Sequence, residues 1–226
     1  MSRNDKGFCR LIEKVGAKFL FVKGRYAWWN DGKELIVYPY IDSKISDALV
    51  LVYDISNIHM DSSLKIEMNG ELSYSEGVEA RKAPPLTQEE LMKVGIWDVN
   101  DNSLRFFGIS DSENNEKPLD VVKVDVPSML GHLSKVRDSK AVVVMNPLEE
   151  TVQIARGKGE YLTVPEMALE CDTTNESELN FNYKSVLSYL ETAQELGQET
   201  IYLGRYNEFT KWKIGDVTSV LMEASM

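Results

Sequence analysis

Residues 178–196 read ELNFNYKSVLSYLETAQEL, a short strand pattern that runs straight into a helix pattern. The first residues alternate between polar and apolar, as in a half-buried strand, and apolar residues then recur every three or four positions. Asn182 stands at the junction after Phe181, where its side chain can accept a hydrogen bond from a first-turn amide. Tyr53 and Asp54 repeat this junction earlier in the chain. The sequence therefore carries one strand-to-helix unit twice.

The repetition extends over both halves of the chain, as helix, strands, helix and strands. Expected helices are 8–15, 55–64, 129–136 and 183–196, and expected strands are 18–22, 26–29, 35–41, 48–53, 65–68, 71–75, 103–109, 141–145, 151–155, 161–170, 179–181, 200–205, 210–214 and 219–223. Turn signals such as Asn30-Asp31-Gly32 and Asn69-Gly70 favour antiparallel pairing. We predict an α+β fold of two similar domains, each with antiparallel sheets and two helices on one face.

A polar stretch near the middle of the chain predicts the domain boundary. The run Ser110–Pro118 has no apolar residue and ends in proline. We place the first domain at 1–110, the linker at 111–118 and the second domain at 119–226. The stretch around Pro84-Pro85 has no counterpart in the second half and is read as an insertion. Within it, Thr87 and Glu90 have the spacing of a capping box.

The first predicted helix has two distinct faces. Phe8, Leu11, Ile12 and Val15 recur at helical spacing and form an apolar stripe. Four cations cluster roughly opposite that stripe, at about 100° per residue: Arg3, Lys6, Arg10 and Lys14. Long cationic side chains on an outer helix face suit phosphate groups, although a merely solvated face would look the same.

The helices of the second half give a weaker signal. Lys135 and Lys184 are the cations on their expected outer faces, together with Ser188 and Thr192. Two acidic residues on the last helix, Glu191 and Glu195, would repel phosphate.

Composition and motifs exclude most catalytic classes. The formal net charge of −11 means that any nucleic-acid contact depends on where the cations sit. His59 and His132 have no partner at metal-ligand spacing, and the calcium-loop-like start at Asp98 lacks the required glycine and final glutamate. We expect no enzyme activity, no metal and no cofactor. The charged N-terminus and the absence of a long apolar run predict a cytoplasmic protein that contacts no membrane.

Taken together, the duplicated domain resembles that of DNA sliding clamps, and the length of the chain is similar to that of the two-domain trimeric clamps of tailed phages. The segments that carry the resemblance are 18–64, with ISDALVLVYDI at 45–55, and 178–223, with Val220-Leu221-Met222 near its end. The similarity is one of pattern over nearly the whole chain, and the insertion at Pro84-Pro85 departs from it.

The resemblance implies a homotrimeric ring that encircles duplex DNA, with its helices lining the hole. Arg3, Lys6, Arg10, Lys14, Lys135 and Lys184 would then face the DNA without reading its sequence. The implied partners are the replicative DNA polymerase, a clamp-loader ATPase and two further copies of the chain. A partner peptide would dock in an apolar groove near the interdomain connector. A non-catalytic, β-rich phage structural or protein-interaction module is the alternative, since fold alone does not assign function.

Overall fold

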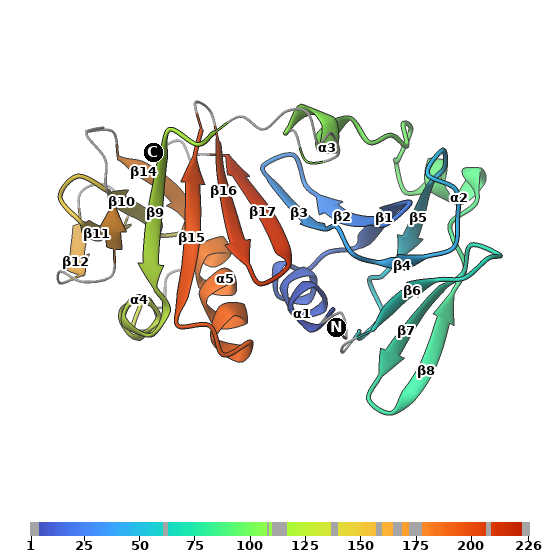
Figure 1. Cartoon of the computed structure of the whole chain (residues 1–226), viewed down its shortest axis with the longest axis horizontal. Helices are drawn as coiled ribbons and strands as arrows, with labels where there is room; N and C mark the ends of the chain where they lie inside the picture. The colour runs from blue at the N-terminus through green and yellow to red at the C-terminus, as the bar shows by residue number, and fades with distance from the viewer. Residues whose placement is uncertain are drawn as a thin grey trace. The chain divides into compact units, whose positions relative to one another are not determined.

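The computed structural model describes residues 5–60, 63–107, 109, 117–136, 140–156, 160–164, 169–171, 178–206 and 209–222. The chain divides into two compact units, Met1–Glu116 and Lys117–Met226. Each unit holds helices and two antiparallel or mostly antiparallel sheets (Figure 1). The structure thus has the α+β architecture expected from the sequence, with few helices and many short strands in antiparallel sheets.

Unit 1 contains three helices and eight strands among its described residues. They are α1 (Lys6–Val15), β1 (Phe19–Lys23), β2 (Tyr26–Asn30), β3 (Glu34–Tyr38), β4 (Asp42–Ser43), β5 (Val50–Asp54), β6 (Leu64–Ile66), β7 (Leu72–Glu76), β8 (Glu79–Ala83), α2 (Gln88–Lys93) and α3 (Asn102–Phe106). One sheet runs β3-β2-β1-β5 and the other β4-β6-β7-β8. Gly32 and Gly70 have positive φ angles of 87° and 81°, as the predicted hairpin turns at these positions require.

Asp5 fastens the first helix of unit 1 to both sheets. It is the residue before α1 and is only 7 % exposed. Its Oδ1 accepts a hydrogen bond from the Tyr38 hydroxyl on β3, and its Oδ2 accepts one from the Leu64 amide on β6, at 2.8 Å. The ring of Phe8 stacks on Tyr38 with centroids 5.5 Å apart. The apolar stripe of α1 is therefore inward, as its spacing predicted.

Unit 2 contains two helices and nine strands among its described residues. They are β9 (Asp120–Asp125), α4 (Val126–Leu133), β10 (Val142–Asn146), β11 (Thr151–Arg156), β12 (Glu160–Val164), β13 (Leu169–Cys171), β14 (Leu179–Asn182), α5 (Tyr183–Glu195), β15 (Thr200–Arg205), β16 (Phe209–Ile214) and β17 (Val217–Met222). Within this unit the sheets run β13-β9-β15-β16-β17 and β12-β11-β10-β14.

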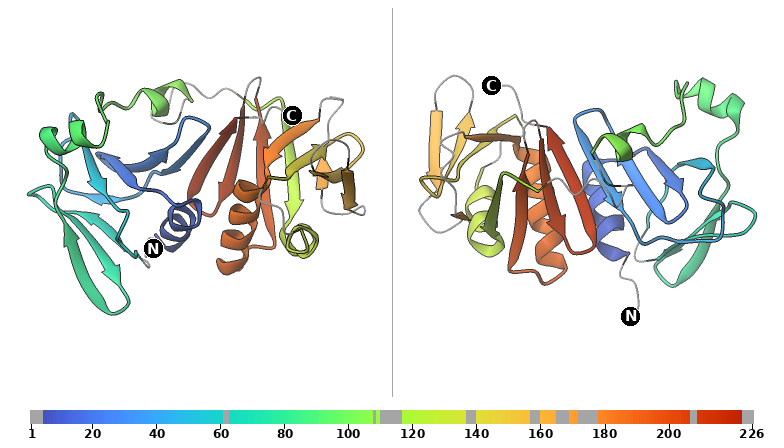
Figure 2. Two further views of the ribbon diagram at one scale, coloured as in Figure 1. Left: turned by 180° about the vertical axis from the view of Figure 1, so that it is seen from behind. Right: turned by 45° about the horizontal axis from the view of Figure 1, so that its top comes forward.

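The core of unit 2 lies where α5 meets strands from both of its sheets. Helix α5 contacts β16, β10 and β14, while α4 packs against α5 and β9 (Figure 2). The buried Trp212 ring makes edge contacts with Tyr189 at 5.4 Å and with Phe181 at 5.2 Å. As predicted, Asn182 caps α5, since its Oδ1 accepts from the Lys184 amide at 2.9 Å.

The second helix predicted for unit 1 is wrong. Residues 55–60 and 63 lie outside any helix, and β6 begins at Leu64. Asp54 does accept from the Ser56 amide at 2.9 Å, so the cap-like junction exists. The residues that follow include several Ser, Asn and Asp, whose side chains compete for backbone hydrogen bonds, so no helix propagates.

The strand predicted at 103–109 is also wrong, because its first residues form α3. The amide of Arg105 donates to the Asp101 carbonyl at 3.2 Å, and the two side chains form an ion pair four residues apart. Leu104 alone faces inward, at 1 % exposure.

The predicted capping box is confirmed, because Thr87 and Glu90 hold each other's backbone amides at the start of α2.

Candidate functional site

Helix α1 brings three of the predicted DNA-facing cations onto one face. Lys6, Arg10 and Lys14 follow one another at four-residue spacing and are half-buried, on the side of the helix away from the apolar stripe. Glu13 shares this face and pairs with Arg10, with Nη1 and Oε2 3.3 Å apart. The face is therefore cationic but not purely so, and Glu13 is an acid that the sequence reading overlooked. Arg3 lies outside the described residues.

The two predicted cations of unit 2 come from neighbouring pieces of backbone. The Tyr183 hydroxyl contacts the carbonyl oxygens of Leu133 and Val136, at 2.7 Å each, and so ties the start of α5 to the end of α4. Lys184 follows Tyr183 directly, and Lys135 lies between the two carbonyls. Both lysines are exposed. The structure thus brings these two cations to one end of the helix pair.

Part of the expected outer face of α5 is buried. Ser188 is 6 % exposed and Thr192 is fully covered, which corrects the expectation that both point outward. Helix α5 is covered by α4 as well as by strands of both sheets of the unit, so little of its surface remains open. Glu191 is half-buried and Glu195 is exposed, so the acids that oppose phosphate binding remain on the accessible part of the helix.

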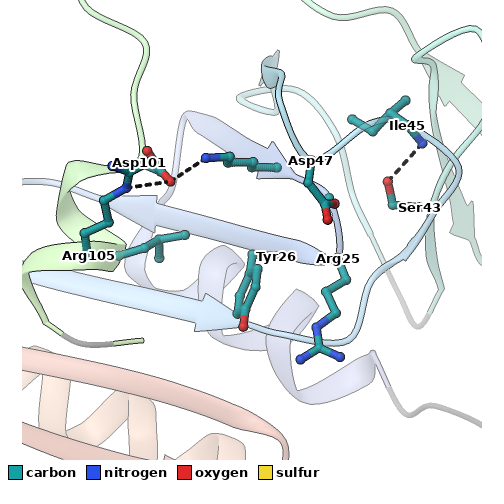
Figure 3. A pocket seen from close by; sticks show the side chains of 10 residues that line it. Arg25, Tyr26, Ser43, Ile45, Asp47, Asp101 and Arg105 are labelled. Carbon is teal, nitrogen blue, oxygen red and sulfur yellow. Dashed lines mark hydrogen bonds and ion pairs between the residues drawn. The ribbon is translucent and has the colours of Figure 1, made fainter. Parts of the chain in front are cut away.

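A second site, absent from the sequence reading, is a pocket within unit 1. Its cavity volume is about 580 Å³ (Figure 3). The wall combines charged, polar and apolar residues from three segments of the unit: Lys23, Gly24, Arg25, Tyr26, Ser43, Ile45, Asp47, Asp101, Leu104 and Arg105. The resemblance implied an apolar groove near the connector, whereas this pocket, part of which is built by α3, is strongly charged. We refer to it as the charged pocket.

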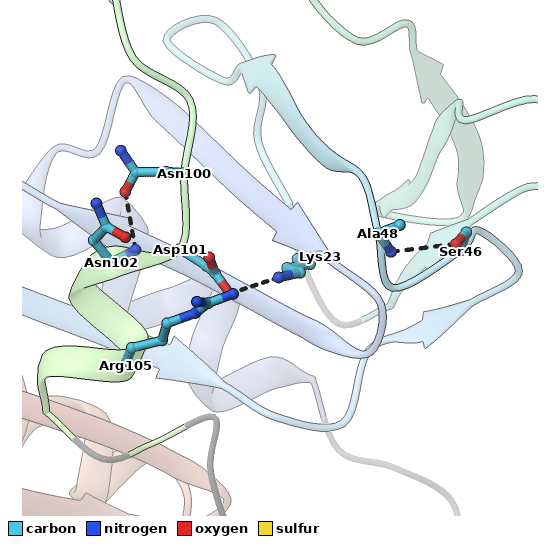
Figure 4. Close-up of polar contacts among 7 residues, drawn as sticks. All are labelled: Lys23, Ser46, Ala48, Asn100, Asp101, Asn102 and Arg105. Carbon is cyan, nitrogen blue, oxygen red and sulfur yellow. Dashed lines mark hydrogen bonds and ion pairs between the residues drawn. The ribbon is translucent and has the colours of Figure 1, made fainter.

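Asp101 organises two of the pocket's three cations. Its Oδ2 accepts from Lys23 Nζ at 2.6 Å and from Arg105 Nε at 3.2 Å (Figure 4). The hydrogen bond from Lys23, followed by that from Arg105, holds the pKa of the Asp101 carboxyl below its usual value, although partial burial opposes this. Asp101 is therefore ionised at neutral pH and fixes the position of α3 relative to β1.

Gly24, in the turn after β1, leaves room for the side chain of Asp47. The φ angle of Gly24 is 52°, and a Cβ atom placed there would lie 1.9 Å from Asp47 Oδ1. No L-residue side chain fits this space without displacing Asp47. The guanidinium of Arg25, the next residue, lies over the Tyr26 ring at 5.7 Å. A tight turn with a glycine between two cations is the only local sequence signal of the pocket.

Among the residues that the structure describes, no three His, Cys, Asp or Glu side chains are grouped so as to hold a metal ion. None of the described helices is long and apolar enough to cross a membrane.

Sequence comparison and structure comparison give different results. No protein-family model and no curated protein matches the chain. Among solved structures, the chain is similar to the DNA polymerase III subunit beta of Pseudomonas aeruginosa, with a TM-score of 0.60 and 11 % identity over 99 % of this chain. It is also similar to the DNA polymerase sliding clamp of Caulobacter crescentus, with a TM-score of 0.60, 12 % identity and 99 % coverage. A putative DNA polymerase III beta subunit from Eubacterium rectale is similar with a TM-score of 0.62 and 12 % identity over 98 % of this chain.

The similarity has a clear extent. The chain covers 66 % of the Pseudomonas protein, 65 % of the Caulobacter protein and 63 % of the Eubacterium protein, so it spans less than two thirds of their length. At 10–12 % identity the likeness concerns the fold and not the function. Nearly the whole of this chain has the sliding-clamp fold.

Proposed function

We propose that the chain is a ring-forming DNA sliding clamp of the two-domain kind made by tailed phages. Three copies close into a ring around duplex DNA, and the ring tethers the replicative polymerase for processive synthesis. A clamp-loader ATPase places the ring on DNA, and the clamp itself catalyses no reaction. The observation that carries the proposal is the likeness to bacterial sliding clamps, which extends over 98–99 % of the chain.

The charges on the helices support a loose contact with DNA. Lys6, Arg10 and Lys14 form one cationic face, and Lys135 and Lys184 add a second cluster in unit 2. Five lysine and arginine residues per chain, offset by Glu13 and the acids of α5, favour weak and screened phosphate contacts. Weak contacts let a closed ring slide, while the ring topology keeps the polymerase at high local concentration on its template.

The first test is the mass of the native protein, measured by light scattering behind a sizing column over a range of concentrations. The proposal predicts a species near three times the 25.6 kDa of one chain. A monomer that persists at high concentration would favour the protein-interaction module instead. That alternative also accounts for the net charge of −11 and needs no DNA.

The second test separates DNA contact from ring formation. A triple variant, Lys6→Glu, Arg10→Glu and Lys14→Glu, is expected to keep the trimer and to lower polymerase processivity. A matched variant carries Lys33→Glu, Lys82→Glu and Lys93→Glu. It makes the same charge change at exposed positions away from the cationic face of α1 and should leave processivity unchanged. Equal processivity in both variants would remove the proposed DNA-facing role of α1.

A further inference from the structure

We propose that Glu13 is a positioning residue of the cationic face of α1. Its carboxylate holds the Arg10 guanidinium along the helix, and so keeps the contact of this face with duplex DNA weaker than the three cations alone would make it. The inference deepens the proposed function and rests on it, because it concerns how tightly the same face holds DNA. Two contacts carry it, one to each oxygen of this carboxylate.

The carboxylate of Glu13 is shared between two elements of unit 1. Its Oε2 accepts from Arg10 Nη1 at 3.3 Å, one helical turn earlier in α1. Its Oε1 lies 2.7 Å from Nδ1 of His59, in the segment between β5 and β6. A single exposed ion pair is weak, because both side chains must be ordered to form it. A carboxylate held at both oxygens is already ordered, and so it is a better partner for Arg10 than an isolated glutamate would be.

The segment that carries His59 is itself fixed to the core of unit 1. At its start the Ile55 amide donates to the Lys18 carbonyl oxygen at 2.8 Å, and the Ile55 side chain is buried. Met60, which directly follows His59, is also buried. The imidazole is therefore presented from an anchored piece of backbone. Glu13 thus receives its second contact from outside the helix, and this contact orients its carboxylate independently of Arg10.

Arg10 is the middle cation of the face and the one best suited to phosphate. It lies between Lys6 and Lys14 at four-residue spacing. Its planar guanidinium binds a phosphate and a carboxylate with the same fork of N–H donors. A phosphate of DNA must therefore compete with Glu13, which is tethered nearby and so has a high effective concentration. Neutralising Glu13 should release the fork and strengthen the contact with DNA.

The test measures binding of the full chain to a short fluorescein-labelled duplex DNA by fluorescence anisotropy, between about 50 and 200 mM salt. Glu13→Gln should bind about threefold to tenfold more tightly than the parent, because an exposed ion pair shifts an equilibrium by roughly 1.5- to 5-fold and a ring presents this face three times. The plot of log K against log salt should become steeper by about 0.9 for each further phosphate contact, which a merely structural change would not produce. The matched control is Glu89→Gln, which breaks an exposed helical ion pair with Lys93 in α2 and should leave affinity and slope unchanged.

Two further variants separate positioning from simple loss of charge. In a chain that already carries Arg10→Gln, Glu13→Gln should raise the affinity by less than about twofold, because the group it acts through is gone. A gain as large as in the parent would show that Glu13 acts by its charge alone, and would overturn its role in positioning Arg10. His59→Ala removes the second contact of the carboxylate and should raise the affinity by less than Glu13→Gln does. An unchanged or lower affinity would contradict the anchoring by His59.

The same titrations distinguish failure of this inference from failure of the proposed function. A parent chain that shows no salt-dependent binding to the duplex would disprove the DNA-facing role of α1, and the role of Glu13 with it. A parent chain that binds the duplex with the same affinity and the same slope as Glu13→Gln would refute the role of Glu13 alone and leave the proposed clamp standing.

Discussion

Replacing Tyr183 by Phe should loosen the junction between α4 and α5 and lower the stability of unit 2. The hydroxyl has one hydrogen, and this hydrogen is shared between the carbonyl oxygens of Leu133 and Val136, at 2.7 Å each. Leu133 O keeps the Val136 amide as a partner at 2.9 Å after the change. Val136 O therefore loses most, and one buried hydrogen bond is removed while the ring stays packed. The expected loss is about 1–2 kcal/mol of unfolding free energy.

Urea denaturation followed by tryptophan fluorescence measures this loss, because Trp212 lies in the core that α5 covers. A loss of that size corresponds to a fall of roughly 5–10 °C in the melting temperature of a unit this small. Tyr202→Phe is the matched control, since its ring is 52 % exposed and the change should stay within about 0.5 kcal/mol. Hydrogen exchange at residues 134–136 should accelerate in the Tyr183 variant only. Equal stability of the two variants would refute this account of the junction.

Three further changes in unit 1 have defined outcomes. Asp5→Ala should cost about 2–4 kcal/mol in urea denaturation, because the Tyr38 hydroxyl and the Leu64 amide lose a buried charged acceptor, and a cost near zero would contradict the role of Asp5. Gly24→Ala should destabilise unit 1, and adding Asp47→Ala should recover the part of the loss due to the clash but not the part due to the positive φ angle. The Asp101 pKa is lowered in the folded state, so the stabilisation that the Asp101 carboxylate gives is present above the ordinary Asp pKa and is lost as pH falls through the folded value. The stability difference between the parent and Asp101→Asn should therefore shrink only in strong acid. A difference that is constant from neutral pH into strong acid would contradict this.

The sequence predicted those elements in which local preference and burial agree. Helix α5 has a cap at Asn182, good helix formers and a continuous apolar face, so its start is correct to the residue. The stretch after Asp54 has a similar cap without the helix formers, and the duplication alone suggested a helix that does not form. The helix propensity of the local residues therefore decided the structure here, and the duplication of the sequence pattern did not.

Elements whose residues lack a burial pattern were missed. Strand β8 has four exposed residues out of five and is held through its register with β7, so no alternation marks it in the sequence. The short helix α3 depends on the Asp101–Arg105 pair and one buried leucine. In the sequence, this mixture of polar and apolar residues resembles the alternation of a strand. Weak periodicity over five residues does not distinguish the two structures.

The two candidate sites differ in how far they could be predicted from the sequence. The cationic face of α1 follows from helical spacing, because its members lie within one element. The charged pocket depends on Lys23 and Asp101, which are 78 residues apart, and on a loop that approaches Gly24. No local pattern connects such residues, so only the tertiary fold reveals this pocket.

The fastening of α1 by Asp5 also sets an order of events during synthesis. The amide that completes this contact belongs to Leu64, 59 residues further along the chain. At a synthesis rate of roughly 5–20 residues per second, Asp5 waits about 3–12 s for this amide, so α1 can be held by β3 alone until β6 is made. Codon changes that slow the ribosome between these positions would lengthen this interval and lower the yield of folded chains, while the melting temperature of the purified protein stays the same.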